Sequence, residues 1–474
     1  MISPDESARK DKRTNLPPEE KRNLPRIKAV LPARVTINGP ADDGTNCFSG
    51  KTVDLHEEGL RLSLDRPLPL SSSVNILITH PRRYGDLPAE AFPIWNRLSP
   101  ADRGFQTGLR VLKIKDVHLG VLKKIIEDYK SLDEKFALLV DNIRGDLLGI
   151  KGMFDDFDRE DNEENLRIDF IETNKPGIFG QLDEYFSRIW DIIKDFGKDR
   201  YAVHQDYYQQ LLGELLLDPI ETNRHVYRKP LGYSGDYTMM NYIYDYHRGR
   251  YLGGSSYEKL INNYTCNIPI ACSNIKRKNF LKESIMRALK RKDGARVLSV
   301  GSGPARELTE LLKENKITGP LIFKCLDPER LALDDVASTI KGIGPLKTRM
   351  LSIEYICRNV TSLIRDKGLK ERLRGQNLIY AFGIFDYLSD RIAAKLTEEL
   401  IHLLDDKGVL VIFNISADEE TGRAYYELLG EWNMIHRTKE QMLAWTEGIR
   451  GRAEIKFEEL AGGSNYLCLI ITRE

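Results

Sequence analysis

The chain of 474 residues is long enough for two to four domains of ordinary size, which excludes a single small module. Lys plus Arg and Asp plus Glu both number 71, so no global charge excess points to nucleic acid or to an anionic membrane as a partner. Apolar residues make up 41% and charged residues 30%, which is typical of a globular protein and excludes a disordered or fibrous one.

Cysteine usage and hydropathy bear on the compartment. The six cysteines, at positions 47, 266, 272, 325, 357 and 468, form no CxxC pair and no dense framework. We therefore expect reduced thiols, no structural disulfide, and no zinc or other metal site. No apolar run approaches the ~20 residues of a membrane span, and the first 22 residues are too polar for a signal peptide. The sequence thus predicts a cytoplasmic protein without a membrane span.

The N-terminal quarter of the sequence shows two different residue patterns. Residues 1–20 are polar, charged and rich in proline without an apolar period, which predicts a mobile arm. Over residues 21–116 short apolar runs such as ARVTI, GKTVDL and SVNILITH alternate with turn signals. This pattern predicts a small β-barrel.

The middle of the chain shows helical spacing. Apolar residues between Val117 and Ile143 fall on one helical face, which predicts one long amphipathic helix leaving the barrel. Residues 155–164 hold seven acidic side chains, which indicates a linker or a solvated turn. Helical spacing resumes at Ile168, with interruptions at KPGIFG and KPLGYSGDY. We expect a helical connecting region over 117–223 and a helical lid or cap segment over 224–294.

The C-terminal part, residues 295–474, alternates strands and helices. A strand, a Gly-rich turn and a helix come first, and further strands are predicted near 321–326, 377–382, 409–414 and 466–472. Such alternation predicts a mostly parallel sheet wrapped by helices. The expected fold class is therefore multidomain: an N-terminal small β-barrel, a helical connecting segment and a C-terminal α/β Rossmann-like domain.

A glycine turn marks the first strand of this α/β domain. In RVLSVGSGPARELTELL, Gly301 and Gly303 stand between an apolar strand and an amphipathic helix, where backbone amides can approach a ligand. Asp327 ends the next predicted strand, where a carboxylate can accept both hydroxyls of a ribose. The alternatives are a strand-to-helix turn in an unrelated α/β domain and, for Asp327, a helix N-cap in DPERL.

This pattern, with NLIYAFGIFDYL as the fourth strand, resembles the class I S-adenosylmethionine-dependent methyltransferases over roughly residues 225–474. The resemblance implies S-adenosyl-L-methionine as cofactor. By position it assigns the cofactor contacts to Ser299, Gly301, Gly303, Asp327 (ribose), Asn359 (adenine) and Phe382. Ser299 departs from the family, which usually carries an acidic residue there. A nicotinamide-dependent oxidoreductase remains an alternative that the missing third glycine disfavours.

The segment before the sheet is rich in tyrosine, with nine of the 21 tyrosines between Tyr227 and Tyr264. Gly232 and Gly235 flank Tyr233 and Ser234 and precede Asp236, a flexible polar turn suited to folding over a small molecule. The alternative is that the tyrosines pack a helical cap against the sheet. Tyr233 and Asp236 are the predicted catalytic residues.

The string KPLGYSGDYTMMN, with FDYLSD downstream, resembles a bacterial methyltransferase group associated with fatty-acid methyl-ester signals of the 3-hydroxypalmitate type. The implied acceptor is the carboxylate of a hydroxylated fatty acid. An ionised carboxylate needs no general base, so the protein would contribute positioning, desolvation and an apolar tunnel. Arg228, Lys229 and Arg277 are candidates to bind the acid, with ordinary surface cations as the alternative.

The barrel region carries a second resemblance. RNLPR places Arg22 and Arg26 four apart, and DLHEEGLRL carries Asp54 and Gly59. These resemble the RxxxR and (D/N)xSxxG signatures of PilZ domains over about residues 20–115. The resemblance implies cyclic di-GMP as a partner, with the arginines on phosphates and guanine faces and Asp54 on a guanine edge. His56 occupies the serine position, where it either contacts phosphate or obstructs the pocket.

Together these patterns predict a cyclic di-GMP-responsive methyltransferase with a small-molecule acceptor, in which the long helix after Lys115 transmits the signal. Two alternatives stay open besides the oxidoreductase. One is a non-catalytic cyclic di-GMP effector whose α/β domain is a scaffold. The other is a barrel kept as an interaction module, with its arginines as ordinary solvated charges.

Overall fold

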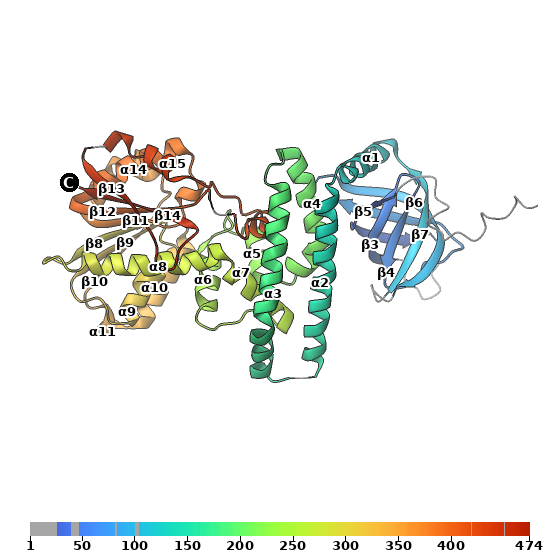
Figure 1. Ribbon diagram of the computed structural model, residues 1–474, viewed down its shortest axis with the longest axis horizontal. Coiled ribbons are helices and arrows are strands. Elements are labelled where there is room, and N and C mark those ends of the chain that lie inside the picture. Colours follow the sequence, from blue (N-terminus) through green and yellow to red (C-terminus); the bar gives the residue numbers. More distant parts are fainter. Residues whose placement is uncertain are drawn as a thin grey trace, which may run out of the picture. The chain divides into compact units, whose positions relative to one another are not determined.

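The computed structural model describes residues 26–38, 47–80, 83–99, 104–160, 162–418, 420–449 and 451–474. Arg22 and the predicted arm of residues 1–20 lie outside these ranges. The chain divides into two compact units, and Figure 1 labels many of their helices and strands. One contains the described residues up to Asp141 together with Asp195–Leu211, and the other contains Asn142–Lys194 and Leu212–Glu474. The helices predicted over 117–223 are therefore shared between the two units.

The first unit is built on an antiparallel barrel. Its strands are β1 (Ile27–Lys28), β2 (Pro32–Ile37), β3 (Cys47–His56), β4 (Gly59–Leu64), β5 (Val74–His80), β6 (Gly85–Ser99) and β7 (Gly104–Ile114). Strand β3 pairs with both β2 and β4, which closes the ring β3-β2-β5-β6-β7-β4, and β1 adds to β3. Alternate residues of β2 point into the core (Ala33, Val35, Ile37). The predicted small barrel is confirmed.

Four long helices follow, and the prediction of one helix between Val117 and Ile143 is wrong. They are α1 (Asp116–Lys130), α2 (Glu134–Arg159), α3 (Glu164–Ile193) and α4 (Lys198–Leu216). The helix is interrupted at residues 131–133. There the Asp133 carboxylate accepts the backbone N–H groups of Lys135 (3.0 Å) and Phe136 (3.3 Å). The Asp133 side chain thus caps the free N–H groups at the start of a second helix, α2. The helical spacing of apolar residues therefore continues across a break between two helices.

Two predicted interruptions are also different in the structure. Helix α3 runs through KPGIFG with Pro176 inside it, and the buried Ile178 and Phe179 keep its apolar face packed beyond the proline. Residues 155–159 of the acidic segment belong to α2, and its described residues Glu160, Asn162 and Glu163 lie outside the helices. The Asp158 carboxylate is mostly buried and accepts from Arg167 and from the backbone N–H of Ser256 at 2.8 Å. Partners within the fold compensate its burial.

Four further helices precede the second sheet: α5 (Glu221–Arg228), α6 (Tyr237–Tyr246), α7 (Ser256–Asn267) and α8 (Pro269–Ala288). The sheet and its connections comprise β8 (Ala295–Val300), α9 (Arg306–Lys313), β9 (Leu321–Asp327), α10 (Arg330–Ile343), α11 (Pro345–Thr348), β10 (Leu351–Cys357), α12 (Ser362–Arg365), α13 (Lys367–Leu373), β11 (Gln376–Ala381), η1 (Phe385–Tyr387), α14 (Asp390–Leu403), β12 (Leu404–Ile415), η2 (Tyr425–Leu429), α15 (Lys439–Ala444), η3 (Glu447–Ile449), β13 (Ala453–Glu458) and β14 (Tyr466–Arg473).

The second sheet has the order β10-β9-β8-β11-β12-β14-β13. Strands β8 to β12 are parallel, whereas β14 is antiparallel to β12 and to β13. The direction of winding reverses between β8 and β11, where open α/β sheets have their ligand crevice. The predicted strands are all present, and the edge strands β10 and β13 were not predicted.

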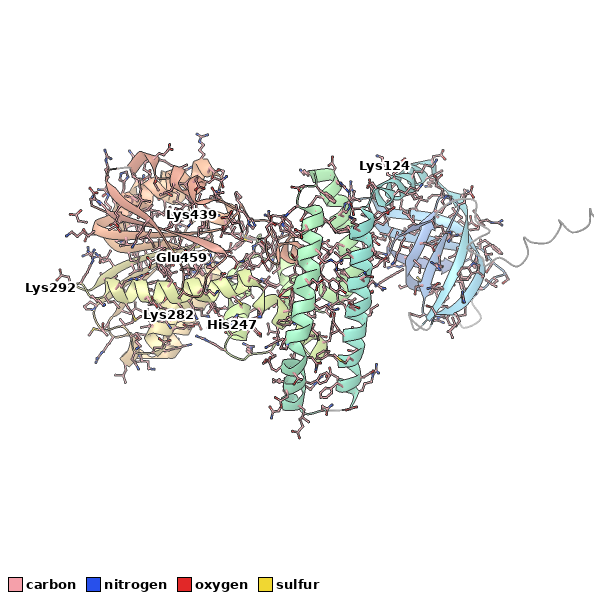
Figure 2. All side chains as sticks on the ribbon, viewed as in Figure 1. Lys124, His247, Lys282, Lys292, Lys439 and Glu459 are labelled. Atoms are coloured by element: carbon pink, nitrogen blue, oxygen red, sulfur yellow. The ribbon has the colours of Figure 1, made fainter. Side chains whose placement is uncertain are left out.

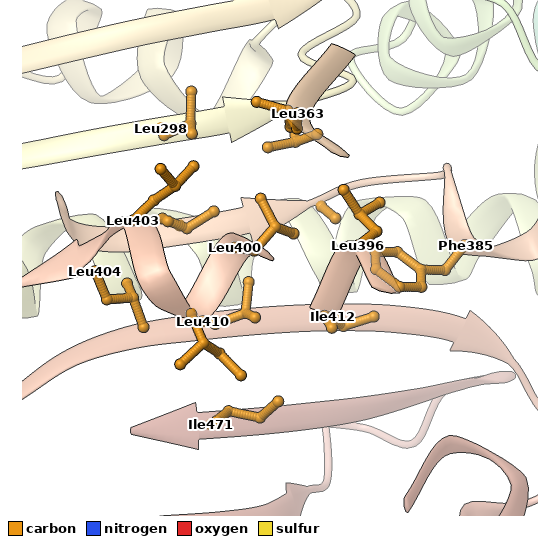
Figure 3. Close-up of a cluster of buried hydrophobic side chains, with 14 of the residues drawn as sticks. Leu298, Leu363, Phe385, Leu396, Leu400, Leu403, Leu404, Leu410, Ile412 and Ile471 are labelled. Atoms are coloured by element: carbon orange, nitrogen blue, oxygen red, sulfur yellow. The ribbon is translucent and has the colours of Figure 1, made fainter. Parts of the chain in front are cut away.

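Helices cover both faces of this sheet. On one face Leu396 and Leu400 of α14 lie in one apolar cluster with Leu298 of β8 and Ile412 of β12 (Figure 3). On the other face Phe280 of α8 contacts Phe413 edge to face at 6.1 Å between ring centroids. The barrel, the helices and the helix-wrapped sheet together confirm the predicted multidomain fold class.

Two features of the described residues concern membrane spans and cysteines. Among the described residues, no helix is both apolar enough and long enough to cross a membrane. The six cysteines are free thiols, and Cys266, Cys325 and Cys468 are buried.

Candidate functional site

A cavity of about 330 Å³ lies at the carboxyl edge of the second sheet, a size in the range of small-molecule sites. Residues that follow β8, end β9 or follow β11 form its floor: Gly301, Gly303, Asp327 and Phe382. Residues between α5 and the middle of α6 form another wall: Tyr233, Gly235, Tyr237 and Met240. The cavity therefore joins the tyrosine-rich segment to the point where the winding of the sheet reverses.

The glycine turn needs glycine for two separate reasons. Both Gly301 (φ +69°) and Gly303 (φ +48°) adopt the left-handed backbone that other residues rarely take. A Cβ on Gly301 would overlap the Ile384 side chain, so this glycine lets the loops after β8 and β11 approach each other. A Cβ on Gly303 meets nothing within 4 Å, so that glycine leaves cavity space open.

The Asp327 carboxylate is held in a fixed orientation at the end of β9. Its Oδ2 accepts from the backbone N–H of Gly303 and its Oδ1 from that of Glu329, both at 2.9 Å. Burial raises the pKa of Asp327, and these two N–H groups oppose the rise. The N-cap alternative for Asp327 is wrong, because Glu329 holds the N-cap position of α10 and no described side chain caps that helix; at this end of α10 the Asp327 carboxylate bonds only to the Glu329 N–H just before it.

The other predicted cofactor residues divide between the cavity and the core. Asn359 and Phe382 line the cavity, and Asn359 Oδ1 accepts the backbone N–H and the hydroxyl of Thr361 at 3.0 Å. Ser299 is fully buried in β8, opposite Cys325 and Tyr380 on the neighbouring strands, and is not part of the cavity wall.

The two predicted catalytic residues have different surroundings. Tyr233 lines the cavity, and burial raises the pKa of its hydroxyl, with Asp327 adding to the rise. Asp236 is fully buried and is not part of the cavity wall. Its Oδ1 accepts the backbone N–H groups of Thr238 (2.9 Å) and Met239 (3.1 Å) at the start of α6. The His225 Nε2 lies 2.8 Å from both carboxylate oxygens, so Asp236 ties α5 to α6.

Of the three candidate cations for an acid, the cavity wall includes one. Arg228 is exposed at the end of α5. Lys229 donates to the Glu431 carbonyl oxygen at 3.0 Å and is not part of the cavity wall. Arg277, on α8, lines the cavity and is 2% exposed.

Several cavity residues were not singled out from the sequence. Asp386, in η1 after β11, is 1% exposed; burial raises its pKa to about 6, and the charge of Arg277 opposes that rise. Trp432 Nε1 donates to the Tyr387 hydroxyl at 2.7 Å, and a Cβ on Gly235 would lie 2.7 Å from the Trp432 ring. Tyr466 opens β14. The FDYLSD string pointed to Asp386 and Tyr387, whereas no local pattern marks Trp432 or Tyr466.

The barrel brings a second set of predicted residues together. The buried Asp54 carboxylate binds two arginines: Oδ1 lies 2.7 Å from Arg26 Nη1 and Oδ2 lies 2.6 Å from Arg61 Nη2. A Cβ on Gly59 would lie 2.7 Å from the Leu109 carbonyl oxygen and 3.1 Å from Arg26 Nη2, so the glycine allows the neighbouring strand and this guanidinium to approach. His56 Nδ1 accepts from the Glu58 backbone N–H at 3.2 Å. Arg61, which was not predicted, completes the cluster.

Comparisons with known proteins find likeness in fold only. No protein-family model matches the chain, and no curated protein matches its sequence. A possible exported protein from Bordetella parapertussis is 14% identical over 64% of this chain and 96% of its own, with a TM-score of 0.40. The methyltransferase domain of bacterial CtHen1 is 16% identical over 42% of this chain and 98% of its own (TM-score 0.32).

A third similar structure is magnesium protoporphyrin IX methyltransferase from Synechocystis with bound S-adenosylmethionine. It is 8% identical over 43% of this chain and 84% of its own, with a TM-score of 0.31.

Proposed function

We propose that this protein is an S-adenosylmethionine-dependent methyltransferase whose cofactor site is the cavity at the carboxyl edge of the second sheet. The observation that carries the proposal is the joint placement of Gly301, Gly303 and Asp327 in one cavity wall. The residues fit such a cofactor: Gly303 leaves space open, and Asp327 offers an oriented carboxylate to a ribose. Asn359 and Phe382 would contact the rest of the nucleoside.

Two features favour this cofactor over a nicotinamide dinucleotide. The dinucleotide fingerprint has its third glycine where this chain has Arg306, whose guanidinium binds Asn241 Oδ1 on α6 at 2.7 and 2.9 Å. The dinucleotide fold continues with a parallel sixth strand, whereas here the antiparallel β14 lies next to β12.

When bound, the cofactor supplies an electrophilic methyl group. The chain's own contribution is to orient the reactants and to exclude water, because an ionised carboxylate acceptor needs no general base. Tyr233, Gly235 and Tyr237 close the cavity on one side, and the Trp432–Tyr387 hydrogen bond holds the neighbouring wall. We infer from the KPLGYSGDY resemblance that the acceptor is the carboxylate of a hydroxylated fatty acid, and the aromatic and apolar lining supports an apolar substrate.

The first test is calorimetry of the purified full chain with S-adenosylmethionine, NAD and cyclic di-GMP. Asp327→Ala should weaken S-adenosylmethionine binding by about 1–3 kcal/mol, the cost of a charge-assisted hydrogen bond left unmade. Asp327→Asn, which keeps one acceptor oxygen, should lose less. Equal affinity of parent and Asp327→Ala for S-adenosylmethionine, or preferential binding of NAD, would refute the cofactor assignment.

The acceptor is tested separately by transfer of a labelled methyl group to fatty acids of graded length. Each buried methylene contributes about 0.8 kcal/mol, so the apparent affinity should rise with chain length. Tyr233→Phe, which keeps the ring in the cavity wall, should retain that trend. If no fatty acid is methylated while S-adenosylmethionine binds, the acceptor assignment fails and the cofactor assignment stands.

A second binding function is supported by the barrel cluster. We infer that cyclic di-GMP binds at Arg26, Asp54 and Gly59, with Arg22 on the preceding segment and His56 at the rim. The arginines carry this inference, because guanidinium groups bind phosphates and stack on guanine bases. Arg61 shares the Asp54 carboxylate with Arg26, so a ligand that recruits Arg26 leaves Asp54 with a second partner.

A further inference from the structure

The guanidinium of Arg277 is a buried cation with unused hydrogen-bond donors. It is 2% exposed, and its Nη2 donates to Asn274 Oδ1 on the same helix. Within the part of the chain that the structure describes, Nε and Nη1 have no hydrogen-bond partner. The guanidinium carbon lies 3.5 Å from the Tyr466 ring centroid and 4.4 Å from that of Phe382. The aromatic rings position the cation, and the Tyr466 hydroxyl also interacts with it, but Nε and Nη1 remain without a hydrogen-bond partner among the described residues.

Such an arrangement is costly unless a ligand completes it. Buried polar groups are almost always hydrogen-bonded, and a buried unpaired charge is among the most destabilising features of a fold. The carboxylate in the same cavity, Asp386, uses Oδ1 to accept the backbone N–H of Ile415 at 2.7 Å. Asp386 thus acts on Arg277 through its charge and does not satisfy the free nitrogens.

The position of Arg277 along the sheet edge separates it from the proposed ribose site. Tyr466 opens β14 and pairs with Ile415 at the end of β12, and Phe382 follows β11. Asp327 ends β9, on the other side of β8. Arg277 therefore faces the half of the cavity that the cofactor's ribose would leave to the acceptor.

We propose that Arg277 is the carboxylate receptor for the methyl acceptor, which it binds through its free Nε and Nη1 while the aromatic walls hold the apolar part. The proposal rests on the methyltransferase assignment of this cavity. It selects Arg277 from three candidate cations and restricts the acceptor to an organic anion. The cofactor also carries a carboxylate, in its amino-acid part, and the experiment must separate the two sources.

The experiment is calorimetry of the full chain, saturated with S-adenosylhomocysteine, against dodecanoate and the matched alcohol 1-dodecanol. The parent should bind dodecanoate at least tenfold more tightly than dodecanol. Arg277→Met should lose that preference through weaker dodecanoate binding, with the affinity for S-adenosylhomocysteine unchanged. Arg287→Ala removes an exposed arginine from the same helix and should behave as the parent.

Stability provides a second readout that a merely structural arginine would not reproduce. Removing one partner of a buried charge pair is destabilising when the other stays charged, but burial raises the pKa of Asp386 to about 6, so this carboxyl takes up a proton below that pH. At pH 5.5 the thermal midpoint of ligand-free Arg277→Met should therefore equal or exceed that of the parent. Arg277→Lys should fold and keep part of the preference for acid over alcohol, because it retains the charge without the guanidinium geometry.

Three results would overturn the proposal. The first is an unchanged dodecanoate preference in Arg277→Met, or no such preference in the parent. The second is a loss of S-adenosylhomocysteine affinity with dodecanoate binding intact, which assigns the arginine to the cofactor's carboxylate. The third is a lower midpoint for Arg277→Met at pH 5.5, which indicates a structural role. Failure of the parent to bind S-adenosylhomocysteine at all would instead refute the methyltransferase assignment.

Discussion

Glu307 is a second carboxyl group buried near the glycine turn, in the first turn of α9. It is 4% exposed and is not part of the cavity wall. Its Oε1 accepts from the Tyr380 hydroxyl at 2.5 Å. Burial raises the pKa of Glu307 to about 6; the Tyr380 bond and the charge of Lys278 oppose the rise, and Glu310 adds to it. The protein therefore holds a carboxyl group that is costly to ionise next to its proposed cofactor turn.

The Tyr380 hydrogen bond is the main interaction that keeps the pKa of Glu307 from rising further, and the charged residues nearby pair with one another. Lys278 on α8 bonds to Glu310 at 2.6 Å, and Lys282 (Figure 2) bonds to Glu310 at 3.1 Å and to Glu314 at 2.6 Å. These pairs join α8 to α9 and place positive charge near the buried carboxyl. Tyr244, also buried, lies close enough for Glu307 to raise the pKa of its hydroxyl further above the ordinary value.

Glu307→Gln should remove a pH-dependent loss of stability. A folded pKa raised from 4.5 to about 6 means that the folded state holds its proton more tightly than the unfolded state. Stability contributed by the protonated form is therefore lost as pH rises from 4.5 through 6, and the loss amounts to about 2 kcal/mol. Glutamine keeps an acceptor for Tyr380 and has no proton to lose. Urea unfolding from pH 4 to pH 8 should show the variant gaining on the parent by about that amount.

The comparison with the parent isolates this one group, because all other titrating residues are common to both proteins. Unfolding free energies that run parallel in parent and Glu307→Gln across this pH range would contradict the argument. A variant that is less stable at every pH would show instead that the ionised carboxylate is needed for packing α9.

At the scale of secondary structure, the connection between α5 and α6 is tied at both ends. Asp236 caps α6 and pairs with His225 on α5, while Gly235 packs against the Trp432 ring. Arg306 joins α6 to the first turn of α9 through Asn241 and Asp245. The proposed lid is thus held by contacts at both ends, and the Asp236 carboxylate stabilises the start of α6.

Asp236→Ala should lower stability by about 1–3 kcal/mol, because it removes an N-cap, typically worth about 1 kcal/mol, and the partner of His225. Asp236→Asn keeps an oxygen for the N–H groups of Thr238 and Met239, so its stability should lie between those of parent and alanine variant. Thermal unfolding and methyl-transfer rates of the three proteins provide the measurement.

The asparagine variant decides between a catalytic and a positioning role for Asp236. If Asp236 only positions α6, Asp236→Asn should regain most of the methyl-transfer rate that Asp236→Ala loses. The remaining difference between Asp236→Asn and the parent should then lie mainly in KM. If the asparagine variant folds as the parent does but is as slow as the alanine variant, the carboxylate takes part in the chemistry.

At the scale of the whole molecule, two helices pass from one compact unit into the other. The division falls after Asp141 within α2 and after Leu211 within α4. Lys28, on β1 two residues after Arg26, pairs with Asp141 at 2.5 Å. The segment proposed to bind cyclic di-GMP therefore contacts α2 at the residue where the first unit ends, which makes α2 the candidate for transmitting a signal.

Arg26→Ala should weaken cyclic di-GMP binding at least tenfold, since it removes a charged donor from the proposed phosphate site. Saturating cyclic di-GMP should change the methyl-transfer rate of the parent and leave that of Arg26→Ala unchanged. Arg34→Ala, at an exposed position of β2, serves as the control. Calorimetry and rate measurements with and without the nucleotide provide the test.

Two outcomes would count against this view of regulation. Equal cyclic di-GMP affinity in parent and Arg26→Ala would show that the Asp54 cluster is not the binding site. A parent that binds the nucleotide with no change in rate would show that the barrel and the cavity are not coupled.

The sequence predicted correctly those features that depend on one segment or on two neighbouring segments of the chain. The alternation of β2 and the strand-turn-helix at Gly301 and Gly303 could be recognised without any tertiary information. Asp327 followed because consecutive parallel strands end at the same edge. The edge strands β10 and β13 were missed because they are only half-buried and lack a continuous apolar run.

Only the tertiary structure decided which polar residues share the cavity. In the sequence Arg228, Lys229 and Arg277 are all basic residues, and nothing local distinguishes them as candidates to bind an acid. The packing of α8 against β11 and β14 buries Arg277 among aromatic rings. Trp432 and Tyr466 come from distant segments, and Asp236 faces His225 where the sequence suggested a ligand. Burial and hydrogen-bond partners depend on contacts between elements far apart in the chain, whereas helix, strand and turn preferences depend on neighbours along it.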